Sequence, residues 1–239
     1  MITLGAIRSV PILAQLADAG SLTYKQVVEA VEKNLNIDEM QADVRIEYSN
    51  KVWTAHLYSW GQDGTSWKVA KFYSDKGPGT IFRKVDNDFS QHNPNDAAYF
   101  PLPGSIDAGV FGTDYSFRDI LEFARLTADY NQVTFETVKY QGTDCYHLVM
   151  QARPGKKPYY NQRELWVDQK TLAPRKMILR GSTGQPIKTI EIEETQPFRG
   201  INYPVKLTVI SGSRNSTTKI SITNLAAIDP GKVRQFQEQ

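Results

Sequence analysis

The chain has 239 residues, of which 40% are hydrophobic, and its 28 basic and 26 acidic side chains give a formal net charge of +2. This length and composition are enough to bury one substantial core, so we expect a single domain over residues 1–239. The charged residues are interspersed and form no basic run, which excludes an electrostatic surface for nucleic acid. A lone cysteine, Cys145, excludes an internal disulfide bond and a cysteine-based zinc cluster.

The two ends of the chain differ in character. Residues 1–20 are mostly apolar, but Arg8 and Pro11 interrupt them, so no run is long enough to span a bilayer. They end in Ala17-Asp18-Ala19, which has the small-x-small form of a signal cleavage site, although no positive charge precedes the apolar part. We therefore expect an N-terminal helix or the remnant of a leader here, and a polar C-terminal tail over residues 228–239.

Two capping signals predict helices. Thr23 and Gln26 form a capping box ahead of apolar residues at helical spacing, which predicts a short amphipathic helix over residues 23–35. Ser116 and Asp119 form a second capping pair, and apolar residues at mostly helical spacing follow it. The sequence thus predicts few helices.

The second helix is predicted over residues 116–127, within a segment that is a candidate lid. Residues 111–127 are rich in Phe, Ile and Leu and are preceded by glycines, a composition typical of a cover that can shift. An amphipathic helix that simply docks on a sheet explains the same pattern.

Almost all of the remaining chain from residue 42 to 224 alternates with a period of two, the pattern of half-buried strands. The sets that share a face are Val44, Ile46 and Tyr48; Trp53, Ala55 and Leu57; Trp67 and Val69; Ile81, Arg83 and Val85; Val133, Phe135 and Thr137; Tyr146, Leu148 and Met150; Arg163, Leu165 and Val167; Met177 and Leu179; Ile190 and Ile192; Val205, Leu207 and Val209; and Ile220 and Ile222. Short turns are predicted between sets, at 77–79, 141–144, 154–157, 169–171 and 182–185.

These turns are short enough to make neighbouring strands antiparallel. Roughly ten strands in up-and-down order accumulate twist, so the sheet must curl into a barrel or part-barrel. We predict a mainly β fold: one strongly curved antiparallel sheet that forms an unclosed half-barrel, with the helices plugging its concave face.

Several stretches carry a resemblance to a known family. They are "SDKGPGTIFRKVDNDFSQHNPN" at 74–95, "GTDYSFRDI" at 112–120, "DYN" at 129–131, and the run from "GTDCYHLVM" to "IKTIEIEE" at 142–194. In this succession the chain resembles the outer-membrane lipoprotein-sorting family of LolA, LolB and LppX over residues 40–225. The resemblance implies an unclosed barrel whose concave side is plugged by helices, leaving an apolar cavity for acyl chains.

An acyl cavity needs apolar walls rather than reactive groups, because burial of each methylene contributes roughly 0.8 kcal/mol. The candidate residues of the cavity and its lid are Trp53, Leu57, Trp67, Val69, Phe82, Phe111, Phe117, Ile120, Leu121, Leu148, Met150, Leu165, Val167, Met177, Leu179, Ile190 and Ile192. Plain core explains each of them singly, so the functional hypothesis concerns the set. Phe123 belongs to the same apolar lid segment.

Catalytic and metal-binding patterns are weak. Cys145 and His147 share a strand face, but neighbours on one face stand roughly 6.5–7 Å apart, too far for a nucleophilic dyad. The histidines, with His56 and His92 as the other two, have no paired ligand spacing. Asp86 and its neighbour Asp88 lack the ligand series of an EF-hand and are better explained as a hairpin tip. We expect no enzyme activity, no catalytic residues, no metal and no cofactor.

The first hypothesis is a periplasmic carrier or chaperone that binds a lipid or lipoprotein acyl chain and moves it between membranes. An inner-membrane exporter, an outer-membrane acceptor and transient membrane contact are the expected partners. The alternative is a regulatory lipid sensor of the RseB and MucB type, which binds a protein partner through the same half-barrel. A hydrolase with a dispersed active site is the third hypothesis.

Overall fold

The computed structural model describes residues 22–74, 77–102, 106–121 and 125–237. The elements in chain order are α1 (Tyr24–Leu35), β1 (Met40–Tyr48), β2 (Lys51–Gln62), β3 (Thr65–Ser74), β4 (Gly77–Val85), β5 (Asp88–His92), β6 (Phe100–Pro101), the 3-10 helix η2 (Val110–Gly112), α2 (Phe117–Leu121), α3 (Leu126–Asp129), β7 (Tyr130–Tyr140), β8 (Thr143–Ala152), β9 (Gln162–Asp168), β10 (Pro174–Arg180), β11 (Pro186–Phe198), β12 (Ile201–Ser211), β13 (Thr217–Ala227) and α4 (Pro230–Gln237). The predicted N-terminal helix or leader at 1–20 lies outside the described residues.

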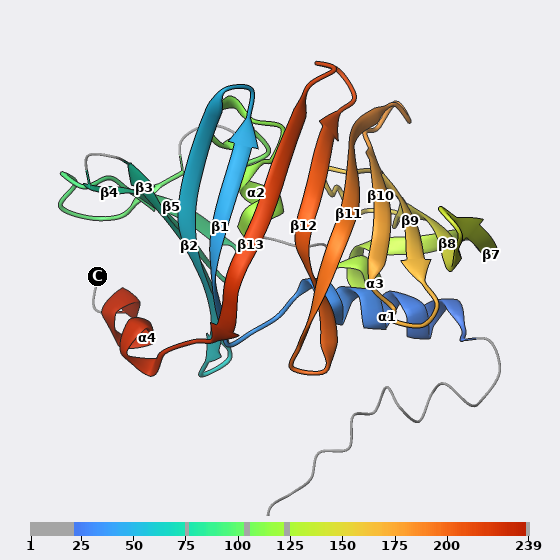
Figure 1. Cartoon of the computed structure of the whole chain (residues 1–239), viewed down its shortest axis with the longest axis horizontal. Helices are drawn as coiled ribbons and strands as arrows, with labels where there is room; N and C mark the ends of the chain where they lie inside the picture. The colour runs from blue at the N-terminus through green and yellow to red at the C-terminus, as the bar shows by residue number, and fades with distance from the viewer. Residues whose placement is uncertain (1–21, 75–76, 103–105, 122–124, 238–239) are drawn as a thin grey trace, which may run out of the picture.

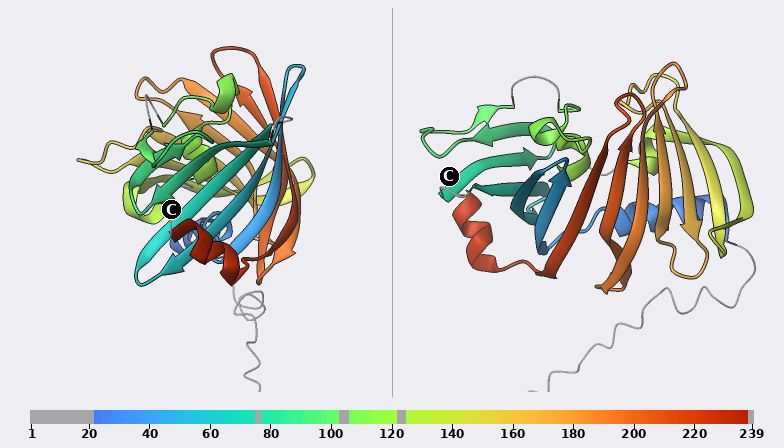
Figure 2. Two further views of the ribbon diagram at one scale, coloured as in Figure 1. Left: turned by 90° about the vertical axis from the view of Figure 1, so that its left-hand side faces the viewer. Right: turned by 45° about the horizontal axis from the view of Figure 1, so that its top comes forward.

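The thirteen strands form one antiparallel sheet in the order β6-β5-β4-β3-β2-β1-β13-β12-β11-β10-β9-β8-β7 (Figure 1). Each half of the chain runs up and down, as predicted, and the halves join where β1 pairs with β13. The edges of the sheet are β6 and β7, so the curl does not close into a barrel. Figure 2 shows the curl from the side, with α1 and α2 inside it. The predicted mainly β half-barrel with helices on its concave face is confirmed.

The predicted turn at 77–79 is wrong, because these residues begin β4 and pair with the end of β3. The β3–β4 register shifts here, and the backbones approach so closely that a Cβ on Gly79 would lie 2.8 Å from the carbonyl oxygen of Phe72. Glycine therefore serves close strand packing rather than a turn. The alternation also does not predict the edge strands β5 and β6, since β5 has the sequence DFSQH and β6 has 2 residues.

Helix α1 begins where the capping box predicts. The Thr23 hydroxyl accepts a hydrogen bond from the Gln26 N–H at 3.4 Å, and the Gln26 side chain accepts one from the Thr23 N–H at 2.9 Å. The predicted apolar residues Val27, Val31 and Leu35 are buried, and the helix packs against β12 and α3. One face of α1 therefore covers the concave side of the sheet.

The second predicted helix is shorter than expected. Its Ser116–Asp119 capping pair is confirmed, because the Asp119 carboxylate accepts hydrogen bonds from the Ser116 N–H at 2.9 Å and its hydroxyl at 2.8 Å. Helix α2 has 5 residues, and α3 is a separate single turn of 4 residues that follows it. Residues 122–124, which include Phe123 of the predicted lid, lie outside the described part of the chain.

The main core fills the space between the concave face of the sheet and these helices. One residue predicted to share the buried face of its strand does not: Val133 is 55% exposed, whereas Phe135 packs on the core. The cause is a register shift between Gln132 and Thr134 in the β7–β8 pair, which takes Val133 out of the alternation.

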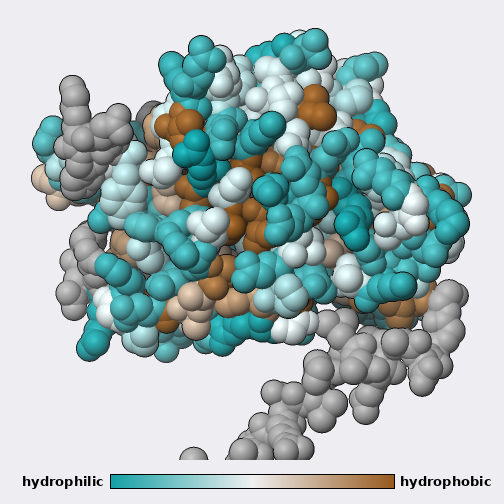
Figure 3. Space-filling model, viewed as in Figure 1, coloured by the Kyte–Doolittle hydropathy of each residue, from teal (hydrophilic) through white to brown (hydrophobic). Residues whose placement is uncertain are grey.

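The outer face of the sheet, opposite α1 and α2, is covered mainly by hydrophilic residues, and apolar colour shows only in patches between them (Figure 3). None of the helices in the described part of the chain has the length and apolar character needed to cross a membrane.

Candidate functional site

Most of the predicted cavity residues meet on the concave face. The members of the main core cluster from the C-terminal half of the sheet are Leu148, Met150, Leu165, Val167, Met177, Leu179, Ile190 and Ile192. From the N-terminal strands and the lid segment, Phe82 and Leu121 belong to the same cluster, and the partly buried Trp53, Leu57, Phe117 and Ile120 pack against it. Segments more than 100 residues apart in sequence thus line one interior.

Trp67 and Val69 lie outside this group. Both side chains pack in a second cluster with Trp60 and Phe236 of α4, although Val69 also borders a cavity described below. In the β2–β3 register Trp67 pairs with Trp60, whereas Leu57 pairs with Ala70. Because side chains alternate across a strand, Leu57 faces inward and Trp60 and Trp67 face the other side.

Aromatic rings gather where the lid segment meets the N-terminal strands. Phe111 stacks on Trp53 with ring centroids 5.6 Å apart, and its edge contact with Phe72 is 5.0 Å between centroids. The ring centroids of Phe117 on α2 and Phe82 on β4 are 4.3 Å apart. Phe111 remains 44% exposed and has a φ of 51°, in the left-handed region that a bulky residue rarely occupies. The cluster thus ends in an exposed, strained apolar residue, a combination common at binding sites.

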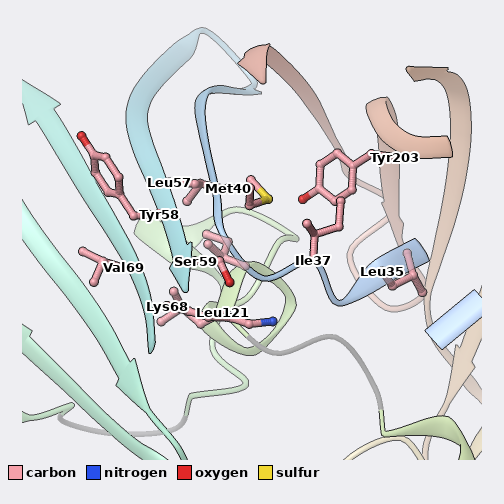
Figure 4. A pocket seen from close by; sticks show the side chains of 11 residues that line it. Leu35, Ile37, Met40, Leu57, Tyr58, Ser59, Lys68, Val69, Leu121 and Tyr203 are labelled. Atoms are coloured by element: carbon pink, nitrogen blue, oxygen red, sulfur yellow. The ribbon is translucent and has the colours of Figure 1, made fainter. Parts of the chain in front are cut away.

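Two small cavities lie beneath α2. The first has a volume of about 30 Å³ and the second about 20 Å³, and Ile120, Leu57 and Tyr203 line both of them. In Figure 4 the side chains of Met40 and Tyr203 lie around the first cavity together with Leu57, whereas Tyr58 points away. Each has room for one or two water molecules. Among the described residues, these two cavities have no room for an acyl chain, which could enter them only by displacing side chains.

Tyr203 and Met40 are wall residues that the sequence reasoning missed. Burial raises the pKa of Tyr203 to about 12, so its phenol is neutral in the interior. The signal was present, because Tyr203 continues the alternation of Val205 and Leu207 toward the start of β12. The first cavity also contains the Ser59 hydroxyl, which is buried without a hydrogen-bond partner among the described residues and is suited to hold a water.

A buried ion pair fastens α2 to the sheet. The Nζ of Lys188 on β11 lies 2.5 Å from the Asp119 carboxylate, and both side chains are 6% exposed. Tyr160 donates its hydroxyl to the same carboxylate at 3.0 Å, and Lys188 also donates to the Asp114 carbonyl at 3.1 Å. Burial, followed by the negative charge of Asp119, raises the pKa of Tyr160. The ammonium and hydroxyl donors around Asp119 therefore offset the free-energy cost of removing its carboxylate from water.

Asp114 provides a second attachment of the same segment. Its carboxylate accepts hydrogen bonds from Arg214 and Ser216, both at 2.8 Å, and the Thr218 hydroxyl lies 3.2 Å away. The side chain of Asp114 is 1% exposed. Residues 113–119 are thus attached to β11 and to the end of the β12–β13 hairpin, while the apolar residues on either side of this stretch make mainly packing contacts.

Cys145 and His147 lie in environments typical of structural side chains. Burial raises the pKa of the Cys145 thiol, the opposite of the shift that a thiolate nucleophile requires. His147 stacks on Trp166 and lies 2.9 Å from Glu136 and 3.0 Å from Glu164. The described residues contain no group of three or more His, Cys, Asp or Glu side chains placed to hold a metal ion.

The comparison with curated proteins finds no match to this chain. Among solved structures, a DUF1329 family protein from Desulfovibrio piger superposes with a TM-score of 0.70 at 19% identity, over 86% of this chain and 93% of that one. A LolA superfamily protein from Nitrosomonas europaea has a TM-score of 0.69 at 17% identity, covering 89% and 97%. A putative outer membrane lipoprotein-sorting protein domain from Vibrio parahaemolyticus has a TM-score of 0.70 at 15% identity, covering 89% and 98%.

These superpositions establish the class of fold: the chain has the open half-barrel of the LolA superfamily, as the sequence resemblance predicted. The family itself is identified from the sequence. A family model described as an uncharacterized protein matches residues 101–239, and the chain belongs to that family.

Proposed function

We propose that this protein is a periplasmic carrier or chaperone that binds the acyl chain of a lipid or lipoprotein and moves it between membranes without covalent chemistry. The observation that carries the proposal is the concave apolar face, closed by α1 and α2 and edged by the exposed Phe111. The likeness to LolA superfamily and lipoprotein-sorting structures supports the same class of function. An inner-membrane exporter and an outer-membrane acceptor are the partners that such a carrier requires.

In this proposal the small cavities are the closed state of the site. The residues to be displaced are Ile120 and Leu121 at the end of α2, which pack on the core that would receive the cargo. Exposing these two side chains costs about 3–6 kcal/mol, whereas each methylene that replaces them returns about 0.8 kcal/mol. Binding therefore breaks even at roughly four to eight methylenes, and longer chains bind with net gain.

A chain-length series tests this directly. The protein, treated with a chelator, is titrated with fatty acids from butanoate to hexadecanoate in competition with a fluorescent fatty acid. We expect no competition from the shortest acids and an affinity that rises steeply above about eight methylenes. Uniform weak binding at every length, or binding that requires a metal, would contradict a cavity that recognises methylenes alone.

Cargo identity needs a second measurement. Native mass spectrometry of the protein purified from its own compartment should show an added mass of lipid or lipoprotein. Tight association with one protein partner, in the absence of any lipid, would favour the sensor alternative instead. The chain is taken in this proposal as one domain with no catalytic residues and no cofactor.

A further inference from the structure

The apolar wall of the concave face contains an arginine. Arg163 lies near the start of β9, where the strand register places it between Met150 of β8 and Leu179 of β10. Both neighbours are core residues, 0% and 2% exposed, and Leu165, two residues further along the same face of β9, is 1% exposed. Arg163 itself is half-buried. Charged side chains are rarely placed among core residues unless they are paired, so the partners of Arg163 are informative.

Two tyrosines hold the Arg163 guanidinium in place. Its central carbon lies 5.2 Å from the ring centroid of Tyr130 and 5.2 Å from that of Tyr160, close enough for cation–π attraction. The Arg163 Nε donates to the Tyr130 hydroxyl at 3.0 Å, and this hydroxyl donates to the Tyr160 carbonyl at 2.6 Å. These contacts fix the direction of the guanidinium but supply no negative charge.

The positive charge of Arg163 is not neutralised within the described part of the chain. No carboxylate there forms an ion pair with the guanidinium, and its two terminal nitrogens donate to no described group. These nitrogens are not among the described side-chain atoms that are enclosed without a partner, so they reach solvent. Lys188, which pairs with Leu179 in the same row, differs because its ammonium lies 2.5 Å from the Asp119 carboxylate. Arg163 thus presents unused donors on the concave side of the sheet.

The unused donors of Arg163 suit an anionic oxygen group. A guanidinium is a planar fork that matches two oxygens of a carboxylate or a phosphate, and such charge-assisted pairs are stronger than neutral hydrogen bonds. A hydrocarbon chain attached to that group would leave Arg163 along its apolar neighbours Met150, Leu165 and Leu179. The arginine and the wall around it therefore have the two characters of an ionised amphiphile.

We propose that Arg163 anchors the head group of the cargo, and that the cargo is an acyl chain ending in a carboxylate or a phosphate rather than an uncharged lipid. This inference rests on the proposed carrier function and specifies the chemical class of its cargo. Tyr130 and Tyr160 are positioning residues, because they orient the guanidinium while its terminal nitrogens bind the ligand.

The test compares three ligands that share one hydrocarbon chain: dodecanoate, dodecyl phosphate and dodecanol. Each is titrated into the chelator-treated full chain, below its micellar concentration, by isothermal titration calorimetry. We expect the anions to bind at least about tenfold more tightly than dodecanol, because hydrogen bonds between charged groups exceed neutral ones. If only one anion exceeds dodecanol, the anchor is supported and the source is identified, a free fatty acid for the carboxylate and a phospholipid for the phosphate.

Arginine variants provide the matched control. Arg163→Gln should weaken binding of the anions about tenfold or more and that of dodecanol less than about twofold, and Arg163→Lys should restore only part of the loss. Arg180→Gln makes the same charge change one strand away. Arg180 pairs with Glu164, which neighbours Arg163 in β9 and so faces the other side of the sheet. This variant should change anion affinity less than about twofold; equal losses in the Arg163 and Arg180 variants would overturn the proposal.

A carbon-13 label on the carboxyl group of dodecanoate separates anchoring from a structural role. A neighbouring cation lowers the pKa of a carboxyl group, so the bound ligand should stay ionised to a lower pH on the wild type than on Arg163→Gln. The measurement is the pH midpoint of the labelled signal in NMR spectra. Because this signal comes from bound ligand alone, partial unfolding of the variant does not imitate the effect, and an unchanged midpoint would overturn the anchor.

Failure of this inference differs from failure of the carrier proposal. If dodecanol binds as tightly as both anions and Arg163→Gln changes none of the affinities, the wall binds methylenes without a head-group anchor, and only the present inference is overturned. If none of the three ligands binds, the concave face does not take up acyl chains, and both proposals are overturned.

Discussion

Replacing Leu121 by aspartate separates a movable cover from an ordinary core helix. Leu121 is 2% exposed at the end of the 5-residue helix α2, where it lines the first cavity. Leu165 is 1% exposed on β9, between β8 and β10, and provides the comparison. Both substitutions place a carboxylate in apolar surroundings, but only the end of α2 can move without breaking the sheet.

The two substitutions should lower the free energy of unfolding by different amounts. Leu165→Asp loses about 2–5 kcal/mol of packing and adds several kcal/mol for an unpaired buried charge, which approaches the whole stability of a domain at about 5–15 kcal/mol. At Leu121 the cost is limited to the free energy of turning this one side chain out of the core, about 2–3 kcal/mol, because the carboxylate then reaches water. At this chain length that lowers the thermal midpoint by about 4–12 °C.

The assay combines thermal unfolding with the fluorescent fatty-acid titration. Leu121→Asp should fold and lose at least about a hundredfold in affinity, Leu121→Ala should fold and retain most binding, and Leu165→Asp should not give a cooperative transition. If Leu121→Asp unfolds as severely as Leu165→Asp, α2 is ordinary core. If Leu121→Asp folds and binds fatty acid normally, the reasoning that places cargo beneath α2 is refuted.

Three further outcomes follow from single contacts. Lys188→Met leaves the Asp119 carboxylate without its cation and should lower the free energy of unfolding, measured in urea, by about 3–5 kcal/mol. Adding Asp119→Leu should recover much of that loss. If it recovers nothing, the pair is needed for more than charge balance. Burial raises the pKa of Asp168, but hydrogen bonds from Arg175 and backbone N–H groups outweigh it and lower the pKa overall. The resulting stabilisation is present above the ordinary carboxyl pKa near 4 and is lost as pH falls through the lower folded value. Urea midpoints of the wild type and Asp168→Asn should therefore differ at pH 6 and converge toward pH 2. Gly79→Ala should destabilise by about 1–3 kcal/mol through the close contact with the Phe72 carbonyl, and an unchanged midpoint would show that β3 and β4 separate there freely.

The features that the sequence predicted correctly are local ones. Thr23 with Gln26 and Ser116 with Asp119 place their caps within four residues, and the strands follow from alternation along each segment. The curl follows from adding twisted strands. The pairing of β1 with β13 is different, because it joins residues almost 190 apart and depends on the whole sheet. Only the family resemblance pointed to an unclosed barrel in advance.

Strand alternation separates the two faces of a sheet, but it does not say what covers each face. Trp67 and Val69 alternate like the residues of the main core, yet they pack in the cluster that α4 covers, and only Val69 also lines the first cavity. The segment 228–239 reads as a polar tail, and its helix depends on Phe236 packing against Trp60, a contact across 176 residues of sequence. The Lys188–Asp119 pair likewise joins residues 69 apart and leaves no local pattern.

The two attachments of residues 113–119 determine how a cover of this kind could move. Asp119 is paired with the buried Lys188 and Asp114 with the half-exposed Arg214, so freeing this stretch as a whole would leave the Lys188 ammonium buried and unpaired, at several kcal/mol. The flanking residues Phe111 and Leu121 lose only apolar contacts on moving, and cargo methylenes can replace those contacts. The least costly opening therefore keeps the polar stretch in place and swings its two apolar flanks outward, which explains how one segment can be firmly attached and still admit a hydrocarbon chain.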